Sequence, residues 1–340
     1  MTFPQRFALA CLCAVGISAA ALAAASSPPS KEDCDNYYLG IHGVPDLAKA
    51  LRCYKAEQRW EMLIVMSLNG EGAPVSIPRA EELLLAWQRE DPNQANSLQA
   101  MALSEIIDER RQHSDGSFPR VDFCRDIAQD TVAMNSCAAL DCEIDEVRLE
   151  TMLAKVKAGL TPVEAAALDK VVVGFKAFES AEGGRAYQRY IGGTGRIIAA
   201  IEQVGFVRDQ FSTLTQNTVE RRQLQPADRG AYEAADRELN QVYRDDIRTY
   251  TKDYEEQIKD DQYANGDRYR FFIEEYKKDS KDAQIHWIRY RDLCAELARL
   301  LYKGKKGEFD PALSMKTAVT RIRVLELRND PMGPGDEEIR

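Results

Sequence analysis

Cysteine is the residue type with the clearest chemistry in this chain, which contains eight of them. A zinc site is not expected, because no C-x-x-C pair is present and the three histidines are scattered along the sequence. An even number of cysteines in an oxidising compartment favours disulfides instead. We therefore predict no metal and no cofactor. The disulfide candidates are Cys34, Cys53, Cys124, Cys137, Cys142 and Cys294.

The spacing of these six cysteines favours two pairings. Within each favoured pair the cysteines are separated by about one helix and a turn, which lets antiparallel neighbours approach within bonding distance. Cys142 and Cys294 are left over, and they either pair or stay as buried thiols. The favoured pairs are Cys34–Cys53 and Cys124–Cys137.

A second set of chemically capable residues lies in the segment AQIHWIRYRDLC, which ends at Cys294. Trp287, Tyr290 and Cys294 fall on one face of a helix, so their default role is in the core. Arg291 lies four residues from Trp287, where its guanidinium stacks on the indole or bridges to Asp236. Either contact would determine how two long helices meet.

Long helices are needed to position these side chains. Apolar residues recur at steps of three and four over residues 232–258 and 269–301, a pattern typical of amphipathic helices. A third helix is predicted over residues 311–329, with Asp310 as its N-cap and a proline in its first turn. Three such helices joined by short loops form an antiparallel bundle. The tail, residues 331–340, is expected to be disordered.

The N-terminus has the pattern of an export signal. Arg6 precedes an apolar run over residues 7–22, and the small residues 23–25 offer a cleavage site. The run is shorter than the roughly 20 residues that span a bilayer. We therefore expect residues 1–25 to be a cleaved signal peptide. The rest of the chain is expected to be periplasmic or secreted, with no transmembrane segment.

Residues 26–112 carry a helical repeat of about 30 residues, in which glycine-containing loops reverse the chain between paired helices. One more helix is expected over residues 95–111, followed by a linker over residues 113–120. The repeated dipeptides are Gly43-Val44 with Lys49-Ala50, and Gly72-Ala73 with Arg79-Ala80.

Downstream of the linker the chain repeats itself at an offset of 112 residues. Phe175 and Phe178 correspond in this way to Trp287 and Tyr290. The first copy has its own helix start in the segment TPVE, residues 161–164, which is a capping box with proline at the first helical position. We infer a duplicated helical domain.

The second copy resembles the LprI-type family of small exported helical domains named for lysozyme inhibition. The family pattern runs A-D-x-x-L-N-x-x-Y, then A-Q-x-x-W-x-x-(Y/F)-R-D-x-x-C, then T-x-x-R-x-x-x-L, the last within TAVTRIRVLELR. The family often carries a cysteine near Met315, and its absence here puts a family-type disulfide to Cys294 in doubt. Cys294 also belongs to the second element, but it comes one residue earlier than the family's spacing sometimes places it. The other residues that match the first two elements are Ala235, Asp236, Leu239, Asn240, Tyr243, Ala283, Gln284, Trp287, Tyr290, Arg291 and Asp292.

The first copy is more divergent. It keeps the start C-x-x-x-x-x-x-T-x-x-M-x-x-C between Cys124 and Cys137, but it has phenylalanines in place of the Trp and Tyr and no following R-D pair. The motif residues are expected to be mainly structural. Ligand capture by Arg291 and Asp292 is the alternative.

Residues 33–88 resemble the Sel-one-like subclass of tetratricopeptide-type repeats, with one good unit and one degenerate unit. The fold class expected for the whole chain is all-α. We expect antiparallel helical repeats in residues 26–112, followed by two elongated three-helix bundles over residues 121–224 and 228–330.

The net charge restricts the kinds of partner that the chain could bind. The net charge of −10, with 29% charged residues, argues against nucleic acid as a partner and is compatible with a basic protein. No catalytic constellation is visible, so an enzyme is not expected. The resemblance implies an exported, non-enzymatic binding protein of the cell envelope that inhibits a lysozyme or another basic wall-degrading enzyme. The alternative is a structural or adaptor protein of the periplasm that binds protein partners through its helical repeats.

Overall fold

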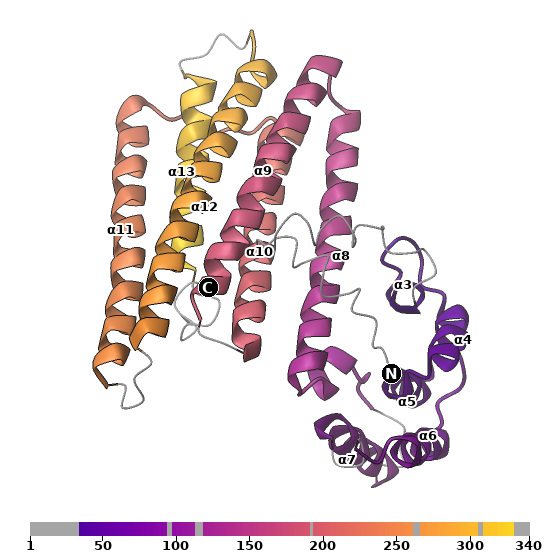
Figure 1. Cartoon of the computed structure of the whole chain (residues 1–340). Coiled ribbons are helices and arrows are strands. Elements are labelled where there is room, and N and C mark those ends of the chain that lie inside the picture. The colour runs from indigo at the N-terminus through magenta and orange to yellow at the C-terminus, as the bar shows by residue number, and fades with distance from the viewer. Residues whose placement is uncertain are drawn as a thin grey trace. The chain divides into compact units, whose positions relative to one another are not determined.

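The computed structural model is all-α. The described residues form helices joined by loops, with no β-strand among them (Figure 1), which confirms the predicted fold class. No helix in this part of the chain is long and apolar enough to cross a membrane. The expected signal peptide, residues 1–25, and the expected tail, residues 331–340, lie outside the described residues. The structure describes residues 34–93, 97–112, 118–190, 193–260, 266–304 and 309–329.

The chain divides into two compact units, and their boundary falls inside helix α8 (Thr131–Ala158). We call the described residues from 34 to 147 the repeat unit, and those from 148 to 329 the bundle unit. Each unit has its own hydrophobic core and is described by itself.

The repeat unit is built from paired helices whose connecting loops repeat. The N–H of Asp46 donates to the carbonyl of Tyr37 at 2.7 Å. The equivalent bond 30 residues later joins the N–H of Ser76 to the carbonyl of Ser67 at 2.9 Å. Asp46 and Ser76 also cap the helices that follow them. The elements before α8 are α3 (Cys34–Leu39), α4 (Leu47–Glu57), α5 (Trp60–Asn69), α6 (Ile77–Glu90), α7 (Leu98–Gln112) and η2 (Phe123–Ile127).

Helix α5 is the centre of the repeat unit. It is apolar on nearly every side, with Met62 to Met66 and Leu68 all buried. Two helical pairs cannot bury such a helix alone, and α7 together with Val121 and Ile127 completes the core. Helix α7 begins at Leu98, three residues later than expected, because the Ser97 hydroxyl accepts a hydrogen bond from the N–H of Ala100 and caps it there.

Both favoured disulfides are present in the repeat unit. Their Cα–Cα distances are 5.3 Å for Cys34–Cys53, which joins α3 to α4, and 5.6 Å for Cys124–Cys137, which joins η2 to α8. Cys294 of the bundle unit is a free, buried thiol, so it does not pair with Cys142. Cys142 takes part in a disulfide, so the expectation that it either pairs with Cys294 or stays a thiol is wrong.

The bundle unit contains the long helices that the sequence predicts. The capping box of Thr161 and Glu164 starts α9, Asp310 caps α13, and Asn329 ends it. The elements are the end of α8, then α9 (Pro162–Gln188), α10 (Gly193–Thr215), η3 (Gln216–Glu220), α11 (Arg229–Asp260), α12 (Gly266–Leu301) and α13 (Pro311–Arg328).

The structure differs from the expected pair of separate bundles. Helices α9 and α12, one from each expected copy, pack along each other (Figure 1), and both stretches contribute to one hydrophobic core. Gly174 permits this approach, since a Cβ there would lie 2.6 Å from Leu293 Cδ1 and 3.5 Å from Tyr290 Cα. A sequence pattern shows which face of a helix is apolar, but not which apolar face it meets.

The α9–α12 contact joins positions that correspond in the predicted duplication. Phe178 and Tyr290 are related by the offset of 112 residues, and their rings stack with centroids 5.9 Å apart and an interplanar angle of 5°. Equivalent residues that meet each other are the mark of an isologous contact, as in a two-fold dimer. This contact favours the predicted duplication.

We expect the Cys34–Cys53 disulfide to stabilise the repeat unit by constraining its unfolded chain. Replacing both cysteines by alanine should lower the free energy of unfolding by about 2–4 kcal/mol, measured by urea denaturation of the full chain. Glu57→Gln, at an exposed neighbouring position on α4, is the control and should change stability by less than about 0.5 kcal/mol. Equal stabilities of the cysteine variant and the wild type would contradict this role.

Candidate functional site

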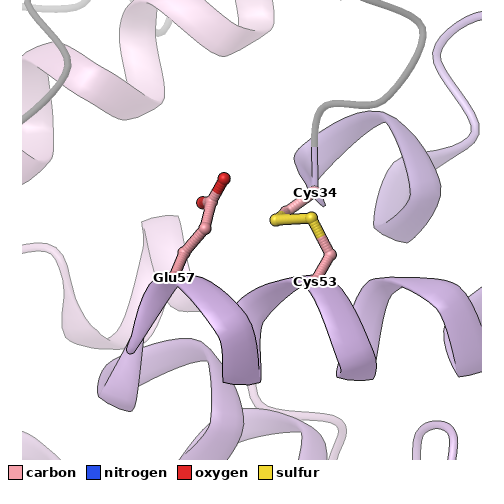
Figure 2. Close-up of side chains that lie close together, drawn as sticks. All are labelled: Cys34, Cys53 and Glu57. Atoms are coloured by element: carbon pink, nitrogen blue, oxygen red, sulfur yellow. A yellow bond between two sulfur atoms is a disulfide. The ribbon is translucent and has the colours of Figure 1, made fainter.

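The cysteine pair of α3 and α4 lies next to a carboxylate. Sulfur atoms of Cys34 and Cys53 and an oxygen of Glu57 lie within 4.8 Å of one another (Figure 2), a grouping that could in principle hold a metal ion. Both sulfur atoms are committed to the disulfide, however, and thiolates rather than disulfide sulfurs are metal ligands. We therefore interpret the group as a structural crosslink beside an exposed carboxylate.

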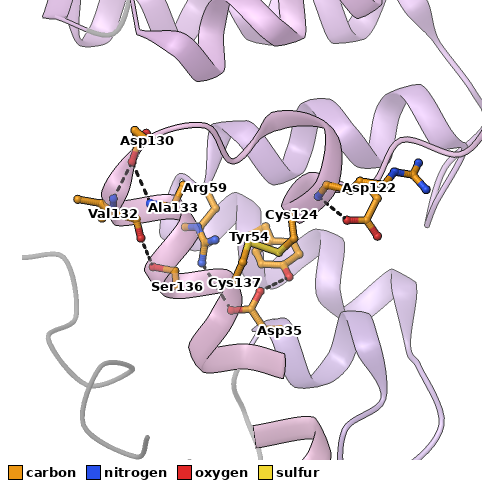
Figure 3. The surroundings of a disulfide bond; sticks show 11 residues. Asp35, Tyr54, Arg59, Asp122, Cys124, Asp130, Val132, Ala133, Ser136 and Cys137 are labelled. Atoms are coloured by element: carbon orange, nitrogen blue, oxygen red, sulfur yellow. Dashed lines mark hydrogen bonds and ion pairs between the residues drawn. A yellow bond between two sulfur atoms is a disulfide. The ribbon is translucent and has the colours of Figure 1, made fainter. Parts of the chain in front are cut away.

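A polar cluster from α3, α4 and the N-cap residue of α5 lies around Tyr54 (Figure 3), which is fully buried. The Tyr54 hydroxyl donates to Asp35 Oδ1 at 2.6 Å, and Arg59 Nη1 lies 3.7 Å from the other oxygen of Asp35. Burial, followed by the charge of Asp35, raises the pKa of Tyr54. The hydroxyl is thus held as a neutral donor, which suits a structural role better than proton transfer.

The aromatic residues of the LprI-like pattern lie in the core of the bundle unit. Trp287 is 2% exposed and Leu239 is 1% exposed, as their places on the apolar stripes predict. Tyr290 packs between the two phenylalanines of the first copy, edge to face with Phe175 and stacked on Phe178. These residues hold α12 against α9 and α11.

Arg291 makes one of the two contacts expected of it. Its guanidinium lies 5.1 Å from the centroid of the Trp287 ring. The carboxylate that it pairs with is Asp292 rather than Asp236, at 3.0 Å. Asp292 also pairs with Lys316 of α13 at 3.0 Å. This R-D pair therefore joins α12 to α13.

The remaining polar residues of the pattern have separate surroundings. Asp236 accepts a hydrogen bond from its neighbour Asn240, one turn along α11. The side-chain oxygen of Gln284 is buried and has no hydrogen-bond partner within the described part of the chain. Tyr243 is half-buried, and burial raises its pKa. The nearby charge of Arg323 lowers this pKa and that of Asp246 raises it. Tyr243 thus borders a group of buried charges.

Five charged side chains form a buried ionic cluster in the bundle unit. Each is at most 4% exposed, and together they come from α9, α11 and α13. They are too deep for a substrate to reach, so the cluster orders helices rather than doing chemistry on a ligand. Its members are Glu182, Arg185, Asp246, Arg323 and Glu326.

Glu182 is the hub of this cluster. Its two oxygens accept hydrogen bonds from two arginines, Arg185 Nη2 at 2.7 Å and Arg323 Nη2 at 2.8 Å. Gln203 of α10 donates to the same carboxylate at 3.0 Å. Arg185 also donates to the hydroxyl of Tyr276 on α12 at 2.9 Å. All five helices from α9 to α13 are joined in this way.

Glu326 is the most weakly paired carboxylate of the cluster. Glu182 is held by two arginines, and Asp246 pairs both with Arg185 and with the part-exposed Arg189 at 2.9 Å. Glu326 has the longest contact, 3.3 Å to Arg323, and burial raises its pKa to about 7. Burial alone would also raise the pKa of Glu182, but Arg185 and Arg323 hold it at about 2. Glu326 is therefore the carboxyl that takes up a proton near neutral pH.

Local sequence patterns do not predict this cluster, although one signal for it is present. The third family element, T-x-x-R-x-x-x-L, fits Thr320, Arg323 and Leu327, and its arginine is a central member. Glu182 and Arg185 are spaced like an ordinary pair on a solvated helix face. Their burial follows only from the packing of α9 against the other helices.

No protein-family model, curated protein or solved structure matches this chain. The resemblances to the LprI-type family and to Sel-one-like repeats therefore remain proposals.

We expect Trp287→Ala to destabilise the bundle unit by about 3–5 kcal/mol, because it empties a large aromatic site in a closely packed core. Thermal and urea denaturation of the full chain measure this loss. The matched control is Ile288→Ala, since the neighbouring Ile288 is 40% exposed and should matter little. An unchanged melting temperature together with loss of partner binding would instead make the indole a contact residue.

Glu326 should make stability depend on pH. Because its folded pKa of about 7 lies above its ordinary value of 4.5, its contribution is fully present below pH 4.5 and is lost as pH rises through 7. The loss amounts to about 3 kcal/mol at alkaline pH. Glu326→Gln should abolish this dependence.

The measurement is the free energy of unfolding of both proteins between pH 5 and pH 9. Glu238→Gln is the control, because Glu238 is exposed and pairs with Arg328 at the same end of α13. Parallel pH curves for the wild type and the Glu326→Gln variant would refute the assignment.

Proposed function

We propose that this chain is an exported, non-enzymatic binding protein of the bacterial envelope, and that its first candidate partner is a basic lysozyme. The observation that carries the proposal is the LprI-like pattern. Its residues occupy connected positions on α11, α12 and α13, from Leu239 in the core to the Arg291–Asp292 pair and the buried Arg323. Because several members of the pattern join these three helices, they support a relationship through a shared fold.

Charge and disulfides support the same proposal. The net charge of −10 favours a cationic partner, because complementary fields raise the rate of association. The two disulfides are consistent with the oxidising compartment to which the N-terminal signal pattern would send the chain. These two features together support a periplasmic or secreted location.

A second candidate function is that of an adaptor which binds protein partners through the repeat unit. It is favoured by the repeated arrangement of helix, loop and capped helix from α3 to α6. A pull-down from envelope extract with the disulfide-intact chain would test this function.

The lysozyme proposal predicts dose-dependent inhibition of a basic lysozyme on cell-wall substrate. Inhibition should weaken as salt rises from low ionic strength to about 0.15 M, where charges are screened beyond about 8 Å. An unrelated protein of similar size and net charge controls for nonspecific attraction. If a folded sample with both disulfides intact does not inhibit the lysozyme, the lysozyme proposal is wrong and the adaptor function is favoured.

A further inference from the structure

The repeat unit holds an extended piece of its own chain in the way that a receptor holds a peptide. This piece, residues 118–122, follows α7 and precedes η2, and we call it the strap. The carboxamide of Asn69 donates through Nδ2 to the carbonyl of Val121 at 2.9 Å and accepts through Oδ1 from the N–H of Val121 at 2.9 Å. One side chain at the end of α5 thus satisfies both backbone polar groups of a residue 52 positions away.

A second contact to the strap backbone comes from α7. Arg110 donates through Nη2 to the carbonyl of Pro119 at 2.7 Å, and through Nη1 to the carbonyl of Leu68. Its guanidinium also lies 5.1 Å from the centroid of the Phe118 ring. Arg110 is 5% exposed, so this contact is formed within the protein.

The side chains of the strap also occupy distinct places. Val121 is 4% exposed and belongs to the core cluster of the repeat helices. Arg120 donates through Nε to Glu71 at 2.7 Å and through Nη2 to the Tyr38 hydroxyl at 2.8 Å. Glu71 lies in the loop between α5 and α6 and also accepts a hydrogen bond from the Tyr38 hydroxyl. A basic residue and the aliphatic residue after it are thus recognised separately.

Main-chain hydrogen bonds that give affinity and side-chain sites that give specificity are how proteins bind extended peptides. We propose that the face of the repeat unit formed by Asn69, Glu71 and Arg110 is a peptide-binding site, and that the strap is its intramolecular occupant. The ligand is an extended peptide with a basic residue followed by an aliphatic one, as in Arg120-Val121. This inference rests on the adaptor function proposed above.

The covalent arrangement makes the strap an effective competitor. A tethered ligand acts at an effective concentration of the order of millimolar, so a free peptide gains access only when the strap is displaced. The strap remains attached on its C-terminal side, where Cys124 of η2 is bonded to Cys137 of α8.

The test uses the full chain and a fluorescein-labelled peptide with the sequence SFPRVD, which is that of residues 117–122. The strap is opened by the double substitution Arg120→Glu and Val121→Gln, which places a carboxylate beside Glu71 and removes the buried aliphatic group. Fluorescence anisotropy should show at least tenfold tighter binding of the peptide to the opened variant than to the wild type. Adding Asn69→Ala should lower this affinity at least tenfold, whereas Asn93→Ala, at an exposed position, should not.

A folded opened variant that binds the peptide no better than the wild type would overturn the proposal. So would an opened variant that binds equally well with and without Asn69, or one that binds a scrambled peptide equally well. If the opened variant does not fold, hydrogen exchange of the wild type decides. Peptide in millimolar excess should increase exchange at the Val121 amide, and unchanged exchange rejects the site.

The function and the site can fail separately. A partner from envelope extract that binds the Asn69→Ala variant as well as the wild type would leave the adaptor function standing and remove this site from it.

Discussion

The bundle unit depends on the pairing of charges inside it. Burying an ion costs several kcal/mol unless the ion is matched by an opposite charge and by hydrogen bonds. Glu182, Arg185 and Arg323 are all at most 1% exposed, and they satisfy one another only when α9 and α13 meet in one register. Asp246 adds α11 to the same arrangement. The apolar stripes supply most of the driving force, but they would tolerate many alignments. The ionic cluster is satisfied in far fewer, and so it specifies how the helices pack.

The two units achieve specificity by different means. The repeat unit has shorter helices, and it is crosslinked by the Cys34–Cys53 and Cys124–Cys137 disulfides and held together by the contact of the strap with Asn69. The bundle unit has long helices, aromatic packing and buried charges. Its one cysteine, Cys294, is a buried thiol whose pKa burial raises to about 12, so it stays protonated and packs as an apolar side chain. Reducing conditions therefore act on the repeat unit, whereas a change of pH acts on the bundle unit through Glu326.

This division bears on function. Most residues that carry the LprI-like pattern hold helices together, whereas Asp236 and Asn240 hydrogen-bond to each other along α11. A relationship to that family would thus show in how the helices of the bundle unit pack. The binding surface would be formed by residues outside the pattern. The repeat unit differs in this respect. Its residues Asn69, Glu71 and Arg110 contact the main chain and side chains of the strap as a receptor contacts a peptide. The repeat unit is where the structure itself offers a binding geometry.

The amino-acid sequence alone determined the all-α class, the starts of α9 and α13 and the two disulfide pairs. Each of these follows from local rules: a 3.6-residue period, caps such as Thr161 and Asp310, and cysteines one hairpin apart. It also placed Trp287 in a core. Only the tertiary structure decided that α9 packs on α12 in a single bundle, that Glu182 and Arg323 meet although 141 residues apart, and that Asn69 holds Val121. These contacts depend on which faces meet, and that choice is made by the fit of whole surfaces, which no local spacing encodes.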